Sequence, residues 1–186
     1  MKQLILLLRP HQWLKNLFIF TPAFFNGHIL DREYLIPSII MFLAYSLAAS
    51  GIYCFNDIYD VEADRQHPKK KFRPIASGAV SKLTGYVLTA VCLLLSLLLV
   101  MFYDWQGEQT RMGLYGVIVF YVLMNVAYCV WLKQKAIVDV FIIAVGFVLR
   151  IVAGGLATGI ELTHWLVLMT FLLAPFLAFA KRRDDV

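Results

Sequence analysis

Long apolar stretches, separated by short polar segments, dominate this sequence of 186 residues. Apolar runs of about 20 residues are typical of helices that cross a membrane. The pattern therefore predicts an all-α integral membrane protein, with residues 1–186 forming a single transmembrane domain built as a multi-span helical bundle. Pro22 interrupts the first predicted span. The six predicted spans are residues 16–30, 35–56, 83–103, 112–132, 136–158 and 163–180.

Composition and charge support this prediction. Hydrophobic residues make up 61% of the chain, whereas soluble domains average about 45–50%. The net charge of +5 does not indicate nucleic acid, because most basic residues fall in alternate polar segments. This positive-inside pattern places both termini and the long loop at about 57–82 on the cytoplasmic side. The expected partners are membrane lipids.

The end of the second span carries a cluster of acidic residues. In a helix that advances about 100° per residue, Asp57, Asp60 and Asp64 share an arc of about 60°, and Asn56 flanks it. Oxygen ligands without His or Cys suit a hard ion such as Mg²⁺, which completes its shell with waters and substrate phosphates. We therefore predict a Mg²⁺ site formed by Asn56, Asp57, Asp60 and Asp64, and catalytic roles for the three aspartates. The alternative is a solvated helix end that stops the span from sliding into lipid.

A basic segment, "HPKKKFRPIASG", follows the acidic cluster. Lys70 and Arg73 are candidates for phosphate contacts, Arg73 through paired hydrogen bonds and Lys70 as a point charge. For the lysines the alternative is strong, because polybasic loops also set membrane topology and contact anionic lipid headgroups.

Polar side chains within the spans are the second functional signal. Asp139 and Arg150 share one face of the fifth predicted span, about 16 Å apart along its axis. Ionisable residues at that depth face a cavity or a partner, so Arg150 is expected to point into the bundle, towards a phosphate or a buried acid. A structural ion pair or a contact that locks helices together is the alternative. Asn125 and Tyr128 form a polar stripe on the fourth span, either as part of a site or as a packing seam.

Several motifs resemble one known family. "NDIYDVEAD", which begins at Asn56, is similar to the first aspartate-rich motif, NDxxDxxxD, of the UbiA-type intramembrane prenyltransferase superfamily. "RPIASG" resembles the segment that follows that motif, and "YCVWLK" resembles a tyrosine–lysine motif after the fourth span. The stretches "LRPHQWLKNLFIFTPAFF" and "DVFIIAVGFVLRIVAGG" look closest to the polyprenyl-phosphate (decaprenyl-phosphate) phosphoribosyltransferase branch.

The resemblance implies a bundle of nine spans, in which two aspartate-rich motifs face each other across a cavity that holds Mg²⁺ and a diphosphate. It implies metal or diphosphate roles for the acidic motif, phosphate contacts for Arg73, Lys133 and Lys15, and a place for Tyr128 in the wall of the reaction chamber. The chain ends at "KRRDDV", where the second acidic motif of the family begins, so we expect a C-terminally truncated chain. A bacterial inner membrane is also implied.

These observations predict a Mg²⁺-dependent transferase that displaces pyrophosphate, moving a 5-phosphoribosyl group from phosphoribosyl pyrophosphate to a polyprenyl phosphate. One alternative is a prenyltransferase that moves a polyprenyl group from its diphosphate to an aromatic acceptor. Alternatives of another class are an inactive fragment and a transporter-like module in which Asp139 and Arg150 relay charge. The candidate substrate-binding residues are Lys15, Asn56, Lys70, Arg73, Asn125, Tyr128, Lys133, Asp139 and Arg150.

Overall fold

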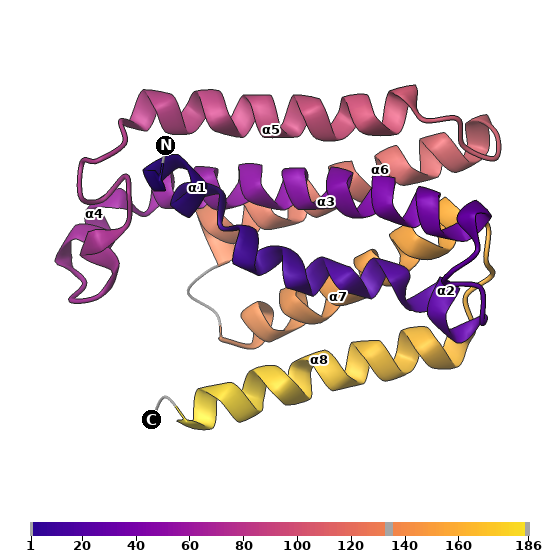
Figure 1. The fold of residues 1–186 in the computed structure, drawn as a ribbon. Helices are drawn as coiled ribbons and strands as arrows, with labels where there is room; N and C mark the ends of the chain where they lie inside the picture. Colours follow the sequence, from indigo (N-terminus) through magenta and orange to yellow (C-terminus); the bar gives the residue numbers. More distant parts are fainter. Residues whose placement is uncertain (1, 133–135, 185–186) are drawn as a thin grey trace.

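The computed structural model describes residues 2–132 and 136–184, and within these ranges the chain forms helices and turns without any strand (Figure 1). The predicted all-α bundle is confirmed. Of the elements labelled η, η1 and η2 are 3₁₀-helices and η3 is a π-helical turn. In chain order the elements are α1 (Lys2–Leu8), η1 (Pro10–Phe20), α2 (Thr21–Phe25), α3 (Arg32–Tyr59), α4 (Val61–Gln66), η2 (Lys70–Phe72), α5 (Lys82–Phe102), α6 (Glu108–Ala127), η3 (Tyr128–Leu132), α7 (Ala136–Thr158) and α8 (His164–Asp184).

Four helical segments among the described residues are long and apolar enough to cross a membrane: Arg32–Tyr59, Lys82–Phe102, Glu108–Leu132 and Val138–Thr158. They correspond to four of the predicted spans. In α8 the apolar stretch His164–Leu173 is shorter than a span. The total of six spans therefore stays a prediction, while the membrane-protein class is clear.

The segment predicted as a first span, residues 16–30, is not one continuous helix. A 3₁₀-helix, η1, is followed by the short helix α2, which ends at Phe25. Pro22 has no amide hydrogen to donate and sits at the start of α2, where this loss is tolerated. A 3₁₀-helix rises about 2 Å per residue, so η1 and α2 together run along much of the length of α3 (Figure 1).

Helix α3 is the centre of the bundle, since α5, α6, α7 and η1 all pack against it. Close packing depends on small residues. A methyl group at Gly51 would lie 3.3 Å from the carbonyl oxygen of Thr89 in α5, and the Thr89 hydroxyl donates a hydrogen bond of 3.2 Å to the Gly51 carbonyl. The other small residues that α3 buries are Ser38, Ala44, Ser46, Ala48, Ala49 and Ser50.

Helix α7 approaches η1 even more closely. A Cβ atom built on Gly154 would lie only 2.0 Å from the carbonyl oxygen of Ile19. The two backbones therefore touch at a point where only glycine fits. This contact fixes η1 between α3 and α7, and η1 carries residues that reach the candidate site.

Helix α1, helix α4 and the C-terminal end of α8 lie at the same end of the bundle (Figure 1). We call it the loop end. The loop between α4 and α5 is folded onto the bundle here, because Ile75 and Val80 are buried. They belong to a small apolar cluster with Leu7, Cys54, Ile58 and Val61.

Candidate active site

The acidic residues lie where α3 passes into α4. The predicted helix over 56–64 bends at Asp60, yet helical hydrogen bonds continue through it, from Asp60 N–H to the Asn56 carbonyl and from Asp64 N–H to the Asp60 carbonyl. Asp57 and Asp64 are buried, with 2% and 3% of their surface exposed. Asp60 is half-buried. Asp60 and Asp64 are close enough to Asp57 for their charges to repel.

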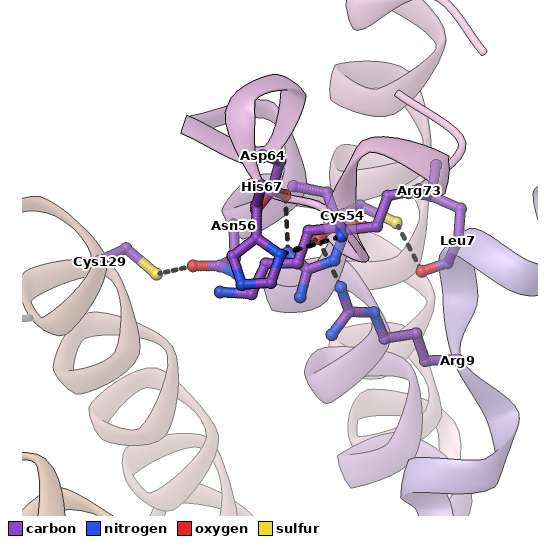
Figure 2. Close-up of polar contacts among 10 residues, drawn as sticks. Leu7, Arg9, Cys54, Asn56, Asp64, His67, Arg73 and Cys129 are labelled. Atoms are coloured by element: carbon purple, nitrogen blue, oxygen red, sulfur yellow. Dashed lines mark hydrogen bonds and ion pairs between the residues drawn. The ribbon is translucent and has the colours of Figure 1, made fainter. Parts of the chain in front are cut away.

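Arg73 connects two of these carboxylates. Its Nη1 atom donates to Asp64 Oδ2 at 2.7 Å and to Asp57 Oδ1 at 3.3 Å (Figure 2). Two of the three aspartates predicted to share a helix face, Asp57 and Asp64, thus meet on one guanidinium. Arg73 reaches them because the loop after η2 is anchored by buried Ile75, two residues further on.

Arg9 is a member of this site that the sequence did not reveal. Its Nη2 atom donates to Asp57 Oδ1 at 2.5 Å, and its guanidinium lies 5.4 Å from the centre of the Tyr53 ring. Arg9 adopts a left-handed backbone conformation, with φ 50° and ψ 57°, which costs a residue other than glycine on the order of 1–3 kcal/mol. Asp57, Asp64, Arg9 and Arg73 together are called the aspartate–arginine cluster below.

The donor atoms of this region suit a hard divalent cation. Asp57 Oδ2 is buried and has no hydrogen-bond partner among the described residues, and the neighbouring ligand types are carboxylate and amide oxygens. As the side chains stand, the arginines neutralise the carboxylates, and no group of three or more His, Cys, Asp or Glu side chains in the described chain is placed to hold a metal. Cation binding there would require the carboxylates to exchange partners.

Asn56 is turned towards a different neighbour. Cys129 Sγ in η3 donates to Asn56 Oδ1 at 3.1 Å (Figure 2). This contact joins the end of α3 to the π-helical turn, which also carries Tyr128. The predicted metal role of Asn56 stays a prediction.

A cavity of about 140 Å³ lies beside the cluster, among η1, α3, α6, η3 and α7. Tyr53 connects the two features, because it lines the cavity while its ring contacts Arg9. Tyr128 Oη donates to Asp139 Oδ1 at 2.6 Å within the cavity wall. The structure thus brings five of the predicted substrate-binding residues to one cavity: Lys15, Asn125, Tyr128, Asp139 and Arg150.

Arg150 points into the bundle, as its depth in the span led us to expect, and only 6% of its surface is exposed. Its Nε donates to Asn16 Oδ1 at 2.8 Å and its Nη1 to the Gly146 carbonyl at 2.6 Å. Asn16 Nδ2 in turn donates to Ser46 Oγ at 2.8 Å. Arg150 therefore forms a contact that locks α7, η1 and α3 together, in addition to lining the cavity. The aromatic rings within 6 Å of its guanidinium are those of Tyr45, Tyr121 and Phe147.

The predicted basic ligands differ in position. Lys15 is exposed and lines the cavity. Lys70 is exposed in η2, and its backbone N–H lies 3.3 Å from His67 Nδ1. The structure does not bring the Lys70 side chain into the aspartate–arginine cluster, which favours the topological interpretation for this lysine. Lys133 lies outside the described residues.

The fold and the site define a multi-span helical membrane protein with a partly buried cluster of opposite charges at one end of its bundle and a polar cavity beside it. Residues 18–185 match the model of the UbiA prenyltransferase family, and the chain belongs to this family. It is also 37% identical to a decaprenyl-phosphate phosphoribosyltransferase of Mycolicibacterium smegmatis, over 98% of this chain and 57% of that protein. The enzyme of the same name from Mycobacterium tuberculosis is 36% identical, over 96% of this chain and 58% of its own length.

Solved structures agree on the fold. A UbiA homolog from Archaeoglobus fulgidus, bound to DMAPP and Mg²⁺, has a TM-score of 0.74 at 22% identity, over 93% of this chain and 60% of that one. A second structure, of a digeranylgeranylglyceryl phosphate synthase, has a TM-score of 0.71 at 20% identity, over 94% of this chain and 58% of that one. The chain thus spans somewhat more than half the length of each of these four proteins.

Proposed function

We propose that this protein transfers a 5-phosphoribosyl group from phosphoribosyl pyrophosphate to a polyprenyl phosphate, with release of pyrophosphate. Two relatives at 36–37% identity carry the name decaprenyl-phosphate phosphoribosyltransferase. The observation that carries the proposal is the contact of Tyr53 with both the aspartate–arginine cluster and the cavity. A diphosphate bound at the cluster would have its transferable group within reach of that cavity.

Asp57, Asp60 and Asp64 would hold the Mg²⁺ ion, which withdraws charge from the departing pyrophosphate when bound. Arg73 would bind phosphate oxygens, since its fork of donors matches them. In the transfer, the bond between ribose C1 and the pyrophosphate oxygen breaks, and an oxygen of the lipid phosphate forms the new bond to C1. The attacking phosphate is already anionic, so no side chain has to remove a proton from it.

The cavity residues would orient the acceptor. Lys15 at its rim offers a mobile positive charge to a lipid phosphate. Tyr128 is held in one orientation by its hydrogen bond to Asp139, and its ring would shield the reacting carbon from water. The exposed apolar faces of the surrounding helices would leave the lipid chain in the bilayer.

The loop end would face the cytoplasm of a bacterial inner membrane, because the basic residues concentrate there and the donor is a soluble phosphate ester. This orientation gives the donor direct access to the aspartate–arginine cluster. The acceptor would enter sideways from the membrane.

Prenyl transfer is a second candidate, because related structures were solved with DMAPP or GPP and Mg²⁺ and a Sulfolobus acidocaldarius relative, 28% identical, is a digeranylgeranylglyceryl phosphate synthase. Both reactions use the carboxylates alike, so the substrates decide between them.

The test supplies membranes containing the protein with labelled phosphoribosyl pyrophosphate, polyprenyl phosphate and Mg²⁺. We expect label in the lipid fraction that disappears with EDTA and with Asp60→Asn, but not with Glu62→Gln, an exposed acid at the same end. Label that enters an acceptor only from a prenyl diphosphate would establish the second candidate. Ion flux through liposomes without any transfer would establish the transporter-like alternative and refute both.

A further inference from the structure

Arg9 and Arg73 contact the same oxygen of one carboxylate. Arg9 Nη2 lies 2.5 Å from Asp57 Oδ1, and Arg73 Nη1 lies 3.3 Å from it. The other oxygen of that carboxylate, Asp57 Oδ2, is buried and has no hydrogen-bond partner among the described residues. Two cations thus share one oxygen, and the second oxygen of the carboxylate is still able to accept a ligand.

The fold holds Arg9 at this position from both sides. Leu7, two residues earlier, is fully buried in the apolar cluster of the loop end, and Pro10 begins η1 directly afterwards. The left-handed conformation of Arg9 turns the chain between these two anchors. Its side chain is nevertheless 19% exposed, so the guanidinium can still meet a ligand from solution. Arg9 also precedes residues 18–185, the segment that the family model matches.

We propose that Arg9 is a donor-binding residue that exchanges partners: it neutralises Asp57 until the donor arrives, and it contacts a diphosphate oxygen when Asp57 binds a divalent cation. This inference rests on the proposed function, which takes Asp57 as a cation ligand and a diphosphate as the anionic group. It adds a residue that lies 48 positions from Asp57 in the sequence.

The charges of the cluster explain why the two ligands would bind together. Two guanidinium groups pair with the carboxylates of Asp57 and Asp64, and Asp60 is close enough to Asp57 to add a third negative charge. A divalent cation alone competes with the guanidinium groups for the charge of the carboxylates and weakens their pairing, which is unfavourable for partly buried charges. A diphosphate supplies another acceptor, because guanidinium groups bind phosphate oxygens with paired hydrogen bonds. Cation and diphosphate should therefore increase each other's affinity by the same factor.

Arg65 is the matched control for Arg9. It lies at the same end of the bundle, donates to the Ala76 carbonyl, and is 3.5 Å from Glu62, but it makes no contact with Asp57 or Asp64 that the structure describes. Replacing either arginine by glutamine removes one positive charge. Only the replacement of Arg9 also removes a partner of Asp57.

The experiment measures Mn²⁺ binding by electron paramagnetic resonance to the purified protein in detergent, with and without pyrophosphate. For the wild type and Arg65→Gln, we expect pyrophosphate to raise Mn²⁺ affinity about tenfold or more, within the usual range of coupling between two ligands. For Arg9→Gln, we expect Mn²⁺ alone to bind about threefold tighter and the gain from pyrophosphate to fall below about threefold. An Arg9→Gln protein with both wild-type constants would overturn the inference.

Asp57→Asn gives an independent measurement if Arg9→Gln does not fold. Loss of this carboxylate frees Arg9, while Arg73 keeps its contact with Asp64. Pyrophosphate without metal should therefore bind about threefold tighter than it does to Glu62→Gln, which has the same net charge. Equal pyrophosphate affinity in these two variants would also overturn the inference.

The two proposals fail in different ways. A wild-type protein that binds no Mn²⁺ even with pyrophosphate would refute the proposed function together with this inference. Mn²⁺ binding that is lost in Asp60→Asn but is unchanged in Arg9→Gln would refute the exchange of Arg9 alone.

Discussion

Two arginine sites in the described part of the chain differ in how their charges are balanced. In the aspartate–arginine cluster, arginine side chains that are 19% and 25% exposed pair with buried carboxylates. Arg150, which is 6% exposed, instead bonds an amide oxygen and a backbone carbonyl and lies among aromatic rings. Opposite charges near solvent can exchange partners with an incoming ion, whereas a cation held by neutral dipoles in the core has no competing partner. The first site is suited to binding ligands and the second to fixing helices.

Among the substitutions that test this comparison, Asp57→Asn should have the largest effect on activity. It keeps the shape of the side chain but removes the charge that both arginines share. We expect the rate of transfer to fall about 10²–10³-fold, as when one group that stabilises developing charge is lost. The measurement is incorporation of labelled phosphoribosyl into lipid, with Glu62→Gln as the control. Wild-type turnover in Asp57→Asn would place the catalytic charges elsewhere.

The second prediction concerns the packing of α7 against η1, which fixes helices around Arg150. Gly154→Ala would put a methyl group 2.0 Å from the Ile19 carbonyl oxygen. This oxygen is a backbone atom, so it cannot move without a shift of η1. We expect a loss of stability of about 3 kcal/mol, at the upper end for overpacking, seen as a lower midpoint of thermal unfolding in detergent. Gly116→Ala is the control, because nothing lies within 4 Å of the added methyl group. Equal midpoints for the two variants would show that α7 and η1 separate easily.

Arg150→Met should have a smaller effect on stability. The change leaves Asn16 Oδ1 buried without the donor that Arg150 supplies and removes one donor to the Gly146 carbonyl, which costs about 2 kcal/mol. Arg111→Met, at an arginine whose side chain is 30% exposed and pairs with Glu108, should change the thermal midpoint much less. If Arg150→Met kept its stability but lost all transfer activity, Arg150 would contact substrate rather than lock helices.

The main helices could be predicted because apolar length is a local property of the sequence. The predicted spans at 35–56 and 83–103 differ from Arg32–Tyr59 and Lys82–Phe102 by only a few residues. The segment at 16–30 could not be predicted in the same way. Its 3₁₀ geometry occurs where η1 packs between α3 and α7, and the contact of Gly154 with Ile19 joins residues far apart in the chain.

The contacts of the candidate site also fall into those that local sequence predicts and those that it does not. Asp57 and Asp64 lie on one side of a helical stretch, so their proximity followed from the rotation of about 100° per residue. Arg9 reaches Asp57 across 48 positions, and Asn16 reaches Arg150 across 134. No local pattern encodes such contacts. Arg9 lies in "LRPHQWLKNLFIFTPAFF", one of the stretches that carry the family resemblance, but nothing in that stretch indicates Asp57 as its partner. Conversely, lysine is a residue type that binds phosphate, but Lys70 is exposed.

The smallest effect on activity should come from Tyr128→Phe. Tyr128 lines the cavity that Arg150 also lines and that lies beside the aspartate–arginine cluster. The change removes the donor of the 2.6 Å hydrogen bond to Asp139 but keeps the ring in the cavity wall. One hydrogen bond is worth about 1 kcal/mol, so we expect about a fivefold loss of transfer efficiency. Tyr115→Phe loses a longer bond, 3.4 Å to the Leu97 carbonyl, in a residue that does not line this cavity, and should keep full activity. The substitution keeps the charge of Asp139 and changes only how the cavity wall is held. The loss should therefore appear in the KM for the lipid acceptor and not in Mn²⁺ affinity. A change in Mn²⁺ affinity instead would mean that the cavity and the aspartate–arginine cluster form one charge network.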